Sequence, residues 1–253
     1  MALVGAGAAA GLVNAVAGGG TLITFPTLIL LGTSAIVANA TSTLALVFGT
    51  AGSVYGYRKQ IAAVKPWLKR FVPISLFGGL LGAILLLRGG ERVFAELVPF
   101  LILFATVLFL AQGALRRLAG FADNPDSTAV HRPHRVWAAV GFQFLVAVYG
   151  GYFGAGIGIL MLASLGFLGL TNIHEMNGLK TVLGSLINVV AAVYLTVAGL
   201  IDWPKMAIMT IGALAGYWFG AHFSQRIPQR RVRQIITAIG FGISAYMFYE
   251  RFR

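Results

Sequence analysis

Hydrophobic residues run along the chain in long stretches, separated by short polar or glycine-rich breaks. The stretches 97–111 and 182–199 contain no charged residue. Each half of the chain holds two short apolar pieces followed by three longer ones, and we expect all of them to be helices: 2–17, 21–32, 35–57, 67–87, 93–115, 137–153, 159–170, 174–197, 205–224 and 232–249. A helix of about 23 residues is about 34 Å long and spans a bilayer, whereas about 12 to 16 residues reach only about 18–24 Å. The short pairs are therefore expected to be helical hairpins that turn back near the middle of the membrane.

The composition places these helices in a membrane. Hydrophobic residues make up 58% of the chain and charged residues 10%, whereas soluble domains contain about 25% charged residues. So little polar surface cannot cover a globule in water, and we expect a multi-pass protein of a bacterial-type inner (plasma) membrane. The formal net charge of +12 comes from clusters of Lys and Arg between apolar segments. Such clusters are typical of contact with anionic membrane lipids, and no motif for nucleic acid is present.

The second half of the sequence repeats the first at an offset of 138 residues. The matched positions carry small or polar residues that chance rarely aligns, and they pair Gly18 with Gly156, Gly20 with Gly158, Asn39 with Asn177, Thr43 with Thr181 and Pro66 with Pro204. Self-similarity at one offset indicates a structural unit that is used twice. We expect one membrane domain with a first repeat at 1–118, a cytoplasmic linker at 119–135 and a second repeat at 136–253.

Basic residues gather in different loops of the two halves. Five Lys and Arg lie within 58–70, whereas the equivalent loop of the second half holds only Asp202 and Lys205. Conversely, 226–233 contains four arginines, and its counterpart near 88–92 is weakly charged. Under the positive-inside rule, equivalent loops with opposite charge character lie on opposite faces, so the repeats are predicted to be inverted. The alternative, a parallel duplication, would put two strongly basic loops on the wrong face.

The inverted arrangement fixes a complete topology. The loops 58–70, 116–135, 174–180 and 226–233 then lie in the cytoplasm with 14 of the 19 Lys and Arg, and both termini lie outside. The predicted fold is an all-α polytopic membrane protein of two inverted repeats. Each repeat consists of one glycine-tipped hairpin and three transmembrane helices.

Glycine clusters at the hairpin tips are the main candidates for a binding site. Glycine lets the chain break its helix and brings backbone N–H groups close to a ligand. The helices expected to start at Thr21 and Ile159 would point their positive ends at the tips, which binds anions without a formal charge. The alternative is close packing of helices through small residues. The candidate tip residues are Gly18, Gly19, Gly20, Thr21, Gly154, Gly156 and Gly158.

Polar side chains near the starts of two mirrored helices form a second set of candidates. Asn39 with Thr43, and Asn177 with Thr181, are spaced four apart, so each pair shares one helix face. These pairs could line the two ends of a polar path, or could only bond neighbouring helices together. Lys180 could attract an anion, or its side chain could reach the membrane interface or pair with Glu175.

Several kinds of chemistry have no motif in this sequence. Carboxylates occur only near the ends of apolar segments, so a sodium site or a carboxylate proton relay has no evident position. We find no Walker A motif, no paired catalytic acids, no HExxH and no metal-binding histidine cluster. We therefore expect neither an enzyme nor a cofactor or metal, and coupling of transport to protons stays open.

At these motifs the chain resembles the sulfite exporter TauE/SafE family of membrane permeases. The similar stretches cover both repeats, and they are GGGTLITFP at 18–26, ANATST at 38–43, GAGIG at 154–158 and NGLK at 177–180. Ser164 stands where the first repeat has Pro26, so the two hairpins need not be equivalent.

The resemblance implies a secondary transporter that exports sulfite or an organosulfonate. The residues alone indicate a small anion bound near the midplane between inverted repeats. The alternatives are an anion channel, an importer of another small anion, a membrane-embedded enzyme and a scaffold that transports nothing. The glycine tips argue against a scaffold, because a protein that transports nothing has no need for a polar cavity near the midplane.

Overall fold

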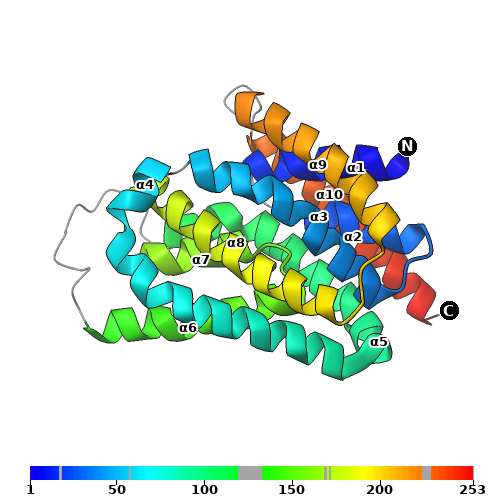
Figure 1. The fold of residues 1–253 in the computed structure, drawn as a ribbon, viewed down its shortest axis with the longest axis horizontal. Coiled ribbons are helices and arrows are strands. Elements are labelled where there is room, and N and C mark those ends of the chain that lie inside the picture. Colours follow the sequence, from blue (N-terminus) through cyan, green and yellow to red (C-terminus); the bar gives the residue numbers. More distant parts are fainter. Residues whose placement is uncertain are drawn as a thin grey trace.

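The computed structural model of the protein describes residues 1–16, 19–56, 58–118, 133–167, 170, 172–223 and 229–252. Within these ranges every regular element is a helix and there is no strand, so the predicted all-α fold is confirmed. The helices are α1 (Ala2–Val16), α2 (Thr21–Leu30), α3 (Ala35–Gly56), α4 (Arg58–Ala63), α5 (Lys65–Leu118), α6 (Pro133–Tyr152), α7 (Ile157–Phe167), α8 (Ile173–Val197), α9 (Trp203–Phe223) and α10 (Gln229–Phe252) (Figure 1). Most of the expected linker, at 119–132, lies outside the described residues.

Three elements differ from the prediction, and one of them is α4, a short helix within the expected loop 58–70. The expected helices 67–87 and 93–115 are nearly continuous in α5, where Gly90 is the one non-helical residue, with φ 76° and ψ 169°. The run Lys65–Ala111 is apolar and 47 residues long, which as one straight helix would be about 70 Å, more than twice the bilayer core. The break at Gly90 lets the chain turn back there. Helix α6 begins at Pro133 and has 20 residues, so this hairpin arm is about 30 Å long and not short.

By length and apolar composition, Lys65–Ala111 and Glu175–Val197 are the runs among the described residues that are suited to cross a membrane. The apolar helices of 10–17 residues include both arms of the first hairpin.

The two repeats exchange partners. Helix α1 of the first repeat packs along α9 of the second, and α6 of the second packs along the start of α5 in the first. A Cβ atom added at Gly216 on α9 would lie 2.0 Å from the Ala8 carbonyl oxygen, and one at Gly82 on α5 would lie 2.1 Å from that of Val148. Glycine at these crossings lets the two backbones touch, as is common between membrane helices.

Equivalent helices run in opposite directions. In Figure 1, α3 starts at the right of the molecule and ends at the left, whereas its counterpart α8 starts at the left and ends at the right. The first part of α5 and its counterpart α9 are opposed in the same way. Both chain ends lie at the right, and α4 lies at the left.

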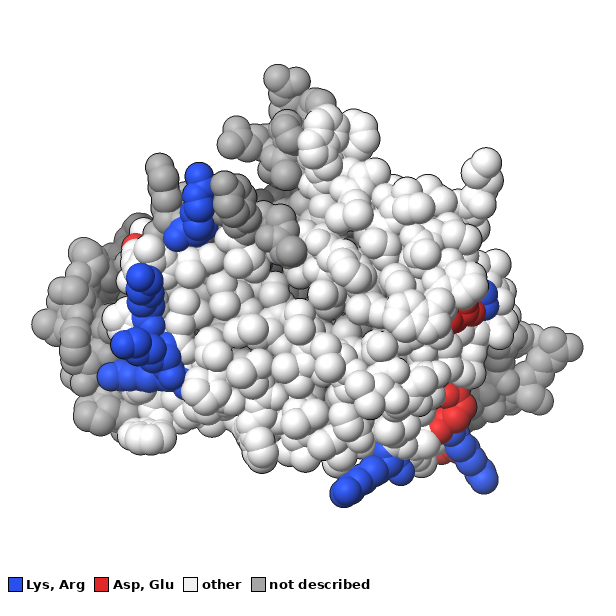
Figure 2. All heavy atoms as spheres, viewed as in Figure 1, with Lys and Arg blue, Asp and Glu red and all other residues white. Residues whose placement is uncertain are grey.

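Charged residues in this view lie at the two ends of the molecule. Figure 2 shows Lys and Arg gathered over α4 and the start of α5, and residues of both signs at the opposite end. The broad face between them carries no Lys, Arg, Asp or Glu in this view. An uncharged face of this kind matches the hydrocarbon layer of a bilayer in character.

Polar side chains tie the helix starts together at the end with mixed charge. The carboxylate of Glu91, next to the break in α5, accepts hydrogen bonds from the backbone N–H groups of Ala35 and Ile36 at the start of α3. Asp202 caps α9 by accepting the Lys205 N–H at 3.1 Å, and it pairs with the Lys205 ammonium at 3.0 Å. Burial alone would raise the pKa of Asp202, but the hydrogen bonds and positive charge of Lys205 outweigh it and hold that pKa below its usual value.

Candidate functional site

A cavity of about 130 Å³ lies where the two hairpin tips meet. Gly19 and Thr21 of the first tip line it, together with Gly154, Gly156 and Gly158 of the second. Helices α2 and α7 begin at Thr21 and Ile157, so both helices start at the cavity wall. The positive ends of two helix dipoles therefore meet at one space.

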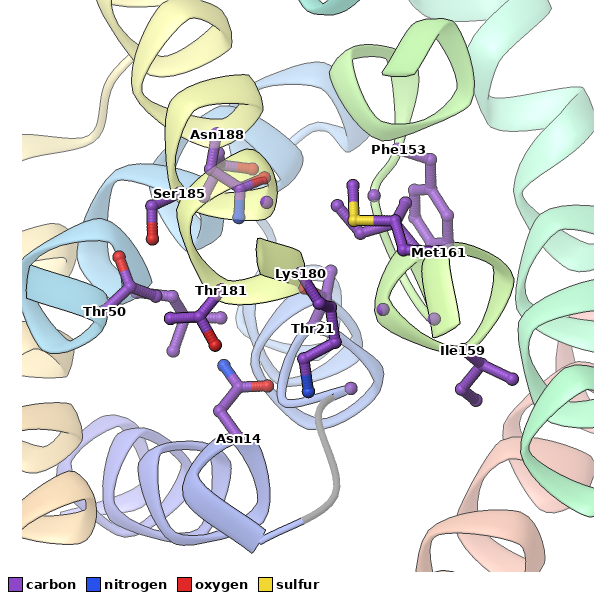
Figure 3. Close-up of a pocket in the computed structure, with 18 of the residues that line it drawn as sticks. Asn14, Thr21, Thr50, Phe153, Ile159, Met161, Lys180, Thr181, Ser185 and Asn188 are labelled. Carbon is purple, nitrogen blue, oxygen red and sulfur yellow. The ribbon is translucent and has the colours of Figure 1, made fainter. Parts of the chain in front are cut away.

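Helices α3 and α8 line the cavity through the same three repeat positions. Thr43, Leu46 and Thr50 come from α3, and Thr181, Gly184 and Asn188 come from α8. Each α8 residue lies 138 positions after its α3 counterpart. Spacings of three and four residues keep each set on one helix face. Figure 3 shows Thr50, Thr181, Ser185 and Asn188 around one side of the cavity.

The first tip is held by a side chain. The Asn14 amide oxygen accepts a hydrogen bond from the Gly20 N–H at 2.7 Å, and the Asn14 amide nitrogen donates to the Tyr217 hydroxyl at 2.9 Å. Asn14 and Tyr217 come from α1 and α9, the pair of helices exchanged between repeats, and both line the cavity. Gly19 adopts φ 95°, and an added Cβ there would lie 2.0 Å from the Phe109 ring.

The second tip is held mainly by its own backbone. The N–H groups of Phe153 and Gly154 donate to the Tyr149 carbonyl at 2.9 and 3.1 Å, which closes the end of α6. The Tyr149 hydroxyl donates to the Ala155 carbonyl at 2.7 Å. Gly156 adopts φ 79°, and an added Cβ there would find its nearest neighbour at 3.6 Å. This position is therefore constrained by backbone conformation and not by space.

Lys180 brings a positive charge to the cavity wall. An added Cβ at Gly158 would lie 3.2 Å from Lys180 Cδ, so the glycine makes room for the aliphatic part of this side chain. Figure 3 shows the ammonium directed away from the second tip, toward the part of the cavity where Thr21 and Asn14 lie. The equivalent residue of the first repeat is Ser42, which is fully buried and hydrogen-bonded to Thr24.

Hydroxyl groups on the two lining helices differ in availability. Thr43 and Thr50 on α3 donate to carbonyls of their own helix, those of Asn39 and Val47, at 2.8 and 2.7 Å. On α8, the Ser185 hydroxyl is buried with no hydrogen-bond partner within the described residues. A hydroxyl proton already used in a backbone bond is not available to a ligand, so α8 offers the better donors.

The structure brings together most of the candidate residues predicted from sequence. Those that line the cavity are Gly19, Thr21, Thr43, Gly154, Gly156, Gly158, Lys180 and Thr181. Gly20 lies behind the wall, where it bonds Asn14. Asn39 is 2% exposed and donates to the Tyr152 carbonyl at 3.1 Å, which ties α3 to the second tip. Asn177 is not part of the lining, and Gly18 lies outside the described residues.

Several lining residues were not predicted as site residues. They are Asn14, Leu46, Thr50, Phe109, Phe153, Ile157, Ile159, Met161, Gly184, Ser185, Asn188 and Tyr217. For Thr50 and Asn188 a signal exists, because each lies seven residues after a predicted threonine on the same helix face. Asn14 and Tyr217 are 203 positions apart and only the packing of α1 on α9 joins them.

The lining is suited to a small anion. It combines two helix starts, hydroxyl and amide groups and one ammonium, and the described lining residues include no carboxylate. Within the described ranges no three His, Cys, Asp or Glu side chains come together as a metal site would require. The arrangement therefore offers positive potential and hydrogen-bond donors, without a nucleophile activated by a neighbouring base.

Comparison with known proteins agrees with this character. The sequence profile described as "Sulfite exporter TauE/SafE" matches residues 3–247. A "probable membrane transporter protein" of Haemophilus influenzae is 28% identical over 249 residues, which cover 97% of this chain and 92% of that protein. The "probable membrane transporter protein YfcA" of Escherichia coli K12 is 24% identical over 242 residues, with 95% and 86% covered. A Sinorhizobium protein, "probable membrane transporter protein ORF9", is 25% identical, with 93% and 87% covered. No solved structure matches the chain.

Proposed function

The chain belongs to the sulfite exporter TauE/SafE family of membrane transporters, and on that premise we propose that it exports a small sulfur-containing anion, sulfite or an organosulfonate. The anion would pass through the cavity between the two glycine tips. One observation carries this proposal: both tips, the starts of α2 and α7, and Lys180 line the same cavity. A sulfur oxyanion presents several acceptor oxygens, and each component of this lining can donate to one.

The second repeat supplies most of the polar contacts in this proposal. The α7 start and the side chains of Lys180, Thr181 and Ser185 would hold the oxygens of the anion. The start of α2 would close the site from the first repeat. The apolar lining from Phe153, Met161 and Ile159 would contact the carbon group of an organosulfonate. Sulfite has no such group.

We further propose that the repeats are inverted across an inner membrane. The opposed directions of α3 and α8 support this arrangement, as does the exchange of partners between α1–α9 and α6–α5. The end with α4 would lie in the cytoplasm because Lys and Arg gather there, and both termini would lie outside. Inverted repeats of this kind place a binding site near the midplane and let either side open in turn.

Flux in proteoliposomes tests the transported substrate. Purified protein should take up labelled sulfite, and unlabelled methanesulfonate or taurine should compete if sulfonates share the site. Preloading with unlabelled anion should accelerate uptake of the label, since a carrier exchanges substrates and a channel does not. The proposed function is contradicted if liposomes with folded protein move none of these anions faster than empty liposomes.

Labelling of single cysteines tests the topology, because the natural chain contains no cysteine. Cysteines introduced at Gln60 and Gln229 should both resist an impermeant thiol reagent in intact cells, and both should react once the membrane is opened. Ala2→Cys should react in intact cells and is the matched control. Labelling of Gln60→Cys alone or Gln229→Cys alone would indicate parallel repeats instead.

A further inference from the structure

Four aromatic rings pack together next to the cavity, and we call them the aromatic cluster: Phe25 on α2, Phe94 on α5, and Tyr152 and Phe153 at the second tip. The centroids of the Phe25 and Phe153 rings are 5.4 Å apart, and those of Phe94 and Tyr152 are 5.6 Å apart. Phe25, Phe94 and Phe153 are at most 2% exposed. Phe153 lines the cavity, whereas Phe94 lies one turn after Glu91, at the end with mixed charge. The aromatic cluster therefore reaches from the cavity toward the end where both termini lie, which we call the terminus side.

The opposite side of the cavity has no equivalent of the aromatic cluster. At 138 positions from its members the sequence has Ala163, Val232, Asn14 and Ala15. Because equivalent helices run in opposite directions, these positions belong to the side of the cavity toward α4. None of them carries a ring, and Asn14 uses its amide to hold the first tip. The two sides of the site are therefore closed by different kinds of side chain.

A hydrogen bond holds the aromatic cluster to α3. The Asn39 amide nitrogen donates to the Tyr152 carbonyl at 3.1 Å, and Asn39 is 2% exposed. Helix α6 ends at Tyr152, so this carbonyl has no partner within its own helix. The equivalent residue of α8, Asn177, is partly exposed, and its side chain makes no hydrogen bond to the described residues. The contact between lining helix and tip is thus made on the terminus side alone.

We propose that the aromatic cluster and Asn39 form the gate between the site and the terminus side, an inference that rests on the proposed function. A layer of packed rings excludes water, and a hydrated anion does not cross it. The gate is closed in this structure, and the site exchanges anion with the α4 side. Opening requires the second tip to move away from Phe25 and Phe94, with release of the Tyr152 carbonyl by Asn39.

The asymmetry sets the resting direction of the site. Opening the gate exposes aromatic surface that is now buried, whereas the equivalent positions on the α4 side bury much less. The empty site therefore faces the α4 side, which is the cytoplasmic side in the topology that we propose. An exporter in this state waits for its anion on the side where the anion is taken up, and gate opening is the release step.

The side from which a reagent reaches the cavity tests the gate. Thr181→Cys places a thiol on the cavity lining of a chain without natural cysteine. In right-side-out and inside-out membrane vesicles, an impermeant anionic methanethiosulfonate should label it from the α4 side at least about tenfold faster than from the terminus side. Ala2→Cys reports which vesicle face carries the termini, so the result does not depend on the loop charges.

Phe94→Leu should loosen the gate. This change removes a ring that contacts the other members of the aromatic cluster, and Phe94 is not part of the cavity lining. Labelling of Thr181→Cys from the terminus side should rise by about fivefold or more. Phe77→Leu is the matched control, because it removes an exposed ring on α5 that stacks on Phe144 away from the gate. It should leave the labelling unchanged.

A pair of equivalent asparagines provides a second test. Asn39→Leu has a similar volume but no donor for the Tyr152 carbonyl, and it should raise labelling from the terminus side by about fivefold, the equivalent of one hydrogen bond. Asn177→Leu makes the same change at the equivalent position of α8. It should not raise labelling from the terminus side, because Asn177 does not hold the gate.

Three results would count against these proposals, and they can be told apart. Equal labelling of Thr181→Cys from both faces, with no gate variant present, overturns the closed gate. Unchanged labelling in folded Phe94→Leu, or in Asn39→Leu if Phe94→Leu does not fold, overturns the role of the aromatic cluster. Both results leave anion flux by the natural protein as evidence for the proposed function. Absence of sulfite and organosulfonate flux contradicts the proposed function, and the gate with it, whatever the labelling shows.

Discussion

The two repeats meet at one cavity through equivalent positions, yet they contribute different chemistry. The first repeat places hydroxyls whose protons are used within α3, and its tip is held by Asn14 and Tyr217. The second repeat places the Lys180 ammonium and the buried Ser185 hydroxyl on α8, and its tip is closed by backbone bonds and by the Tyr149 hydroxyl. The repeat supplies the framework, and in the function that we propose the second half binds the anion while the first half encloses it.

The largest expected effect separates glycines that pack helices from glycines that form the tips. Gly216→Val should prevent accumulation of folded protein, because the Ala8 carbonyl lies 2.0 Å from the added Cβ. We expect a loss of stability above about 3 kcal/mol. Membrane yield and elution as a single species in size-exclusion chromatography measure it. The matched control is Gly242→Ala, where an added Cβ meets nothing within 4 Å. Normal yield of Gly216→Val would contradict the close packing of α1 on α9.

Alanine at each tip tests whether space or conformation limits the two turns. Gly19→Ala meets the Phe109 ring and an unfavourable φ, whereas Gly156→Ala meets only the unfavourable φ. We expect Gly156→Ala to cost about 1–2 kcal/mol and Gly19→Ala to cost about 1–3 kcal/mol more. Thermal unfolding in detergent ranks them. Both variants should reduce transport per folded molecule by more than tenfold. A factor of ten corresponds to about 1.4 kcal/mol of lost binding free energy.

Loss of one tip hydrogen bond should affect the first tip more than the second. Asn14→Leu removes the acceptor for the Gly20 N–H and the donor to Tyr217. Tyr149→Phe removes one bond to Ala155 but leaves two backbone bonds that close the end of α6. We expect transport to fall about tenfold in Asn14→Leu and about twofold in Tyr149→Phe. Equal effects would show that the two tips are held alike.

Removal of a hydroxyl at equivalent positions should show which repeat donates to the anion. Thr181→Val should raise the KM for sulfite by about fivefold, the equivalent of one hydrogen bond. Thr43→Val should change it by less than about twofold, because the Thr43 proton is donated to the Asn39 carbonyl. Initial rates of uptake in proteoliposomes provide both values. A larger change in Thr43→Val would reverse the assignment of the repeats.

The smallest expected effect lies at the end with mixed charge. Because the folded-state pKa of Asp202 is lowered, its contribution to stability is present above the unfolded-state value and is lost as the pH falls below about 4. The change in melting temperature between pH 7 and pH 3 should therefore be slightly smaller in Asp202→Asn than in wild type. Glu96→Gln is a control at a salt bridge whose side chains are largely exposed. An identical pH dependence in Asp202→Asn and wild type would show that the pair with Lys205 adds nothing.

The sequence predicted the helices well, because long apolar runs with glycine breaks leave few alternatives for the backbone. The family resemblance noted at the tip motifs is confirmed by the match over 3–247, and the expectation of a transporter and not an enzyme agrees with it. The offset of 138 residues also located both tips before any coordinates. It could not reveal Asn14, whose partner Tyr217 depends on how α1 packs along α9.

Two further features were beyond sequence reasoning for physical reasons. The direction of the Asn39 side chain depends on the position of the Tyr152 carbonyl, more than a hundred residues away. The hydrogen bond of Thr43 to its own helix is one of several rotamers that the sequence leaves open. Motifs locate polar residues on a face, whereas packing decides which of them face a ligand and which face a neighbouring helix.

The exchange of α1 and α9 also sets a timetable for biogenesis. The ribosome completes α9 about 200 residues after α1, which at roughly 5–20 residues per second takes about 10–40 s. For that interval the first hairpin is in the bilayer without the helix that covers its glycine face, whereas α6 meets a finished α5 as soon as it emerges. A first half made alone should therefore be degraded in the cell. Co-expression of 1–118 with 133–253 should rescue it, as immunoblots of pulse-chased membranes would measure.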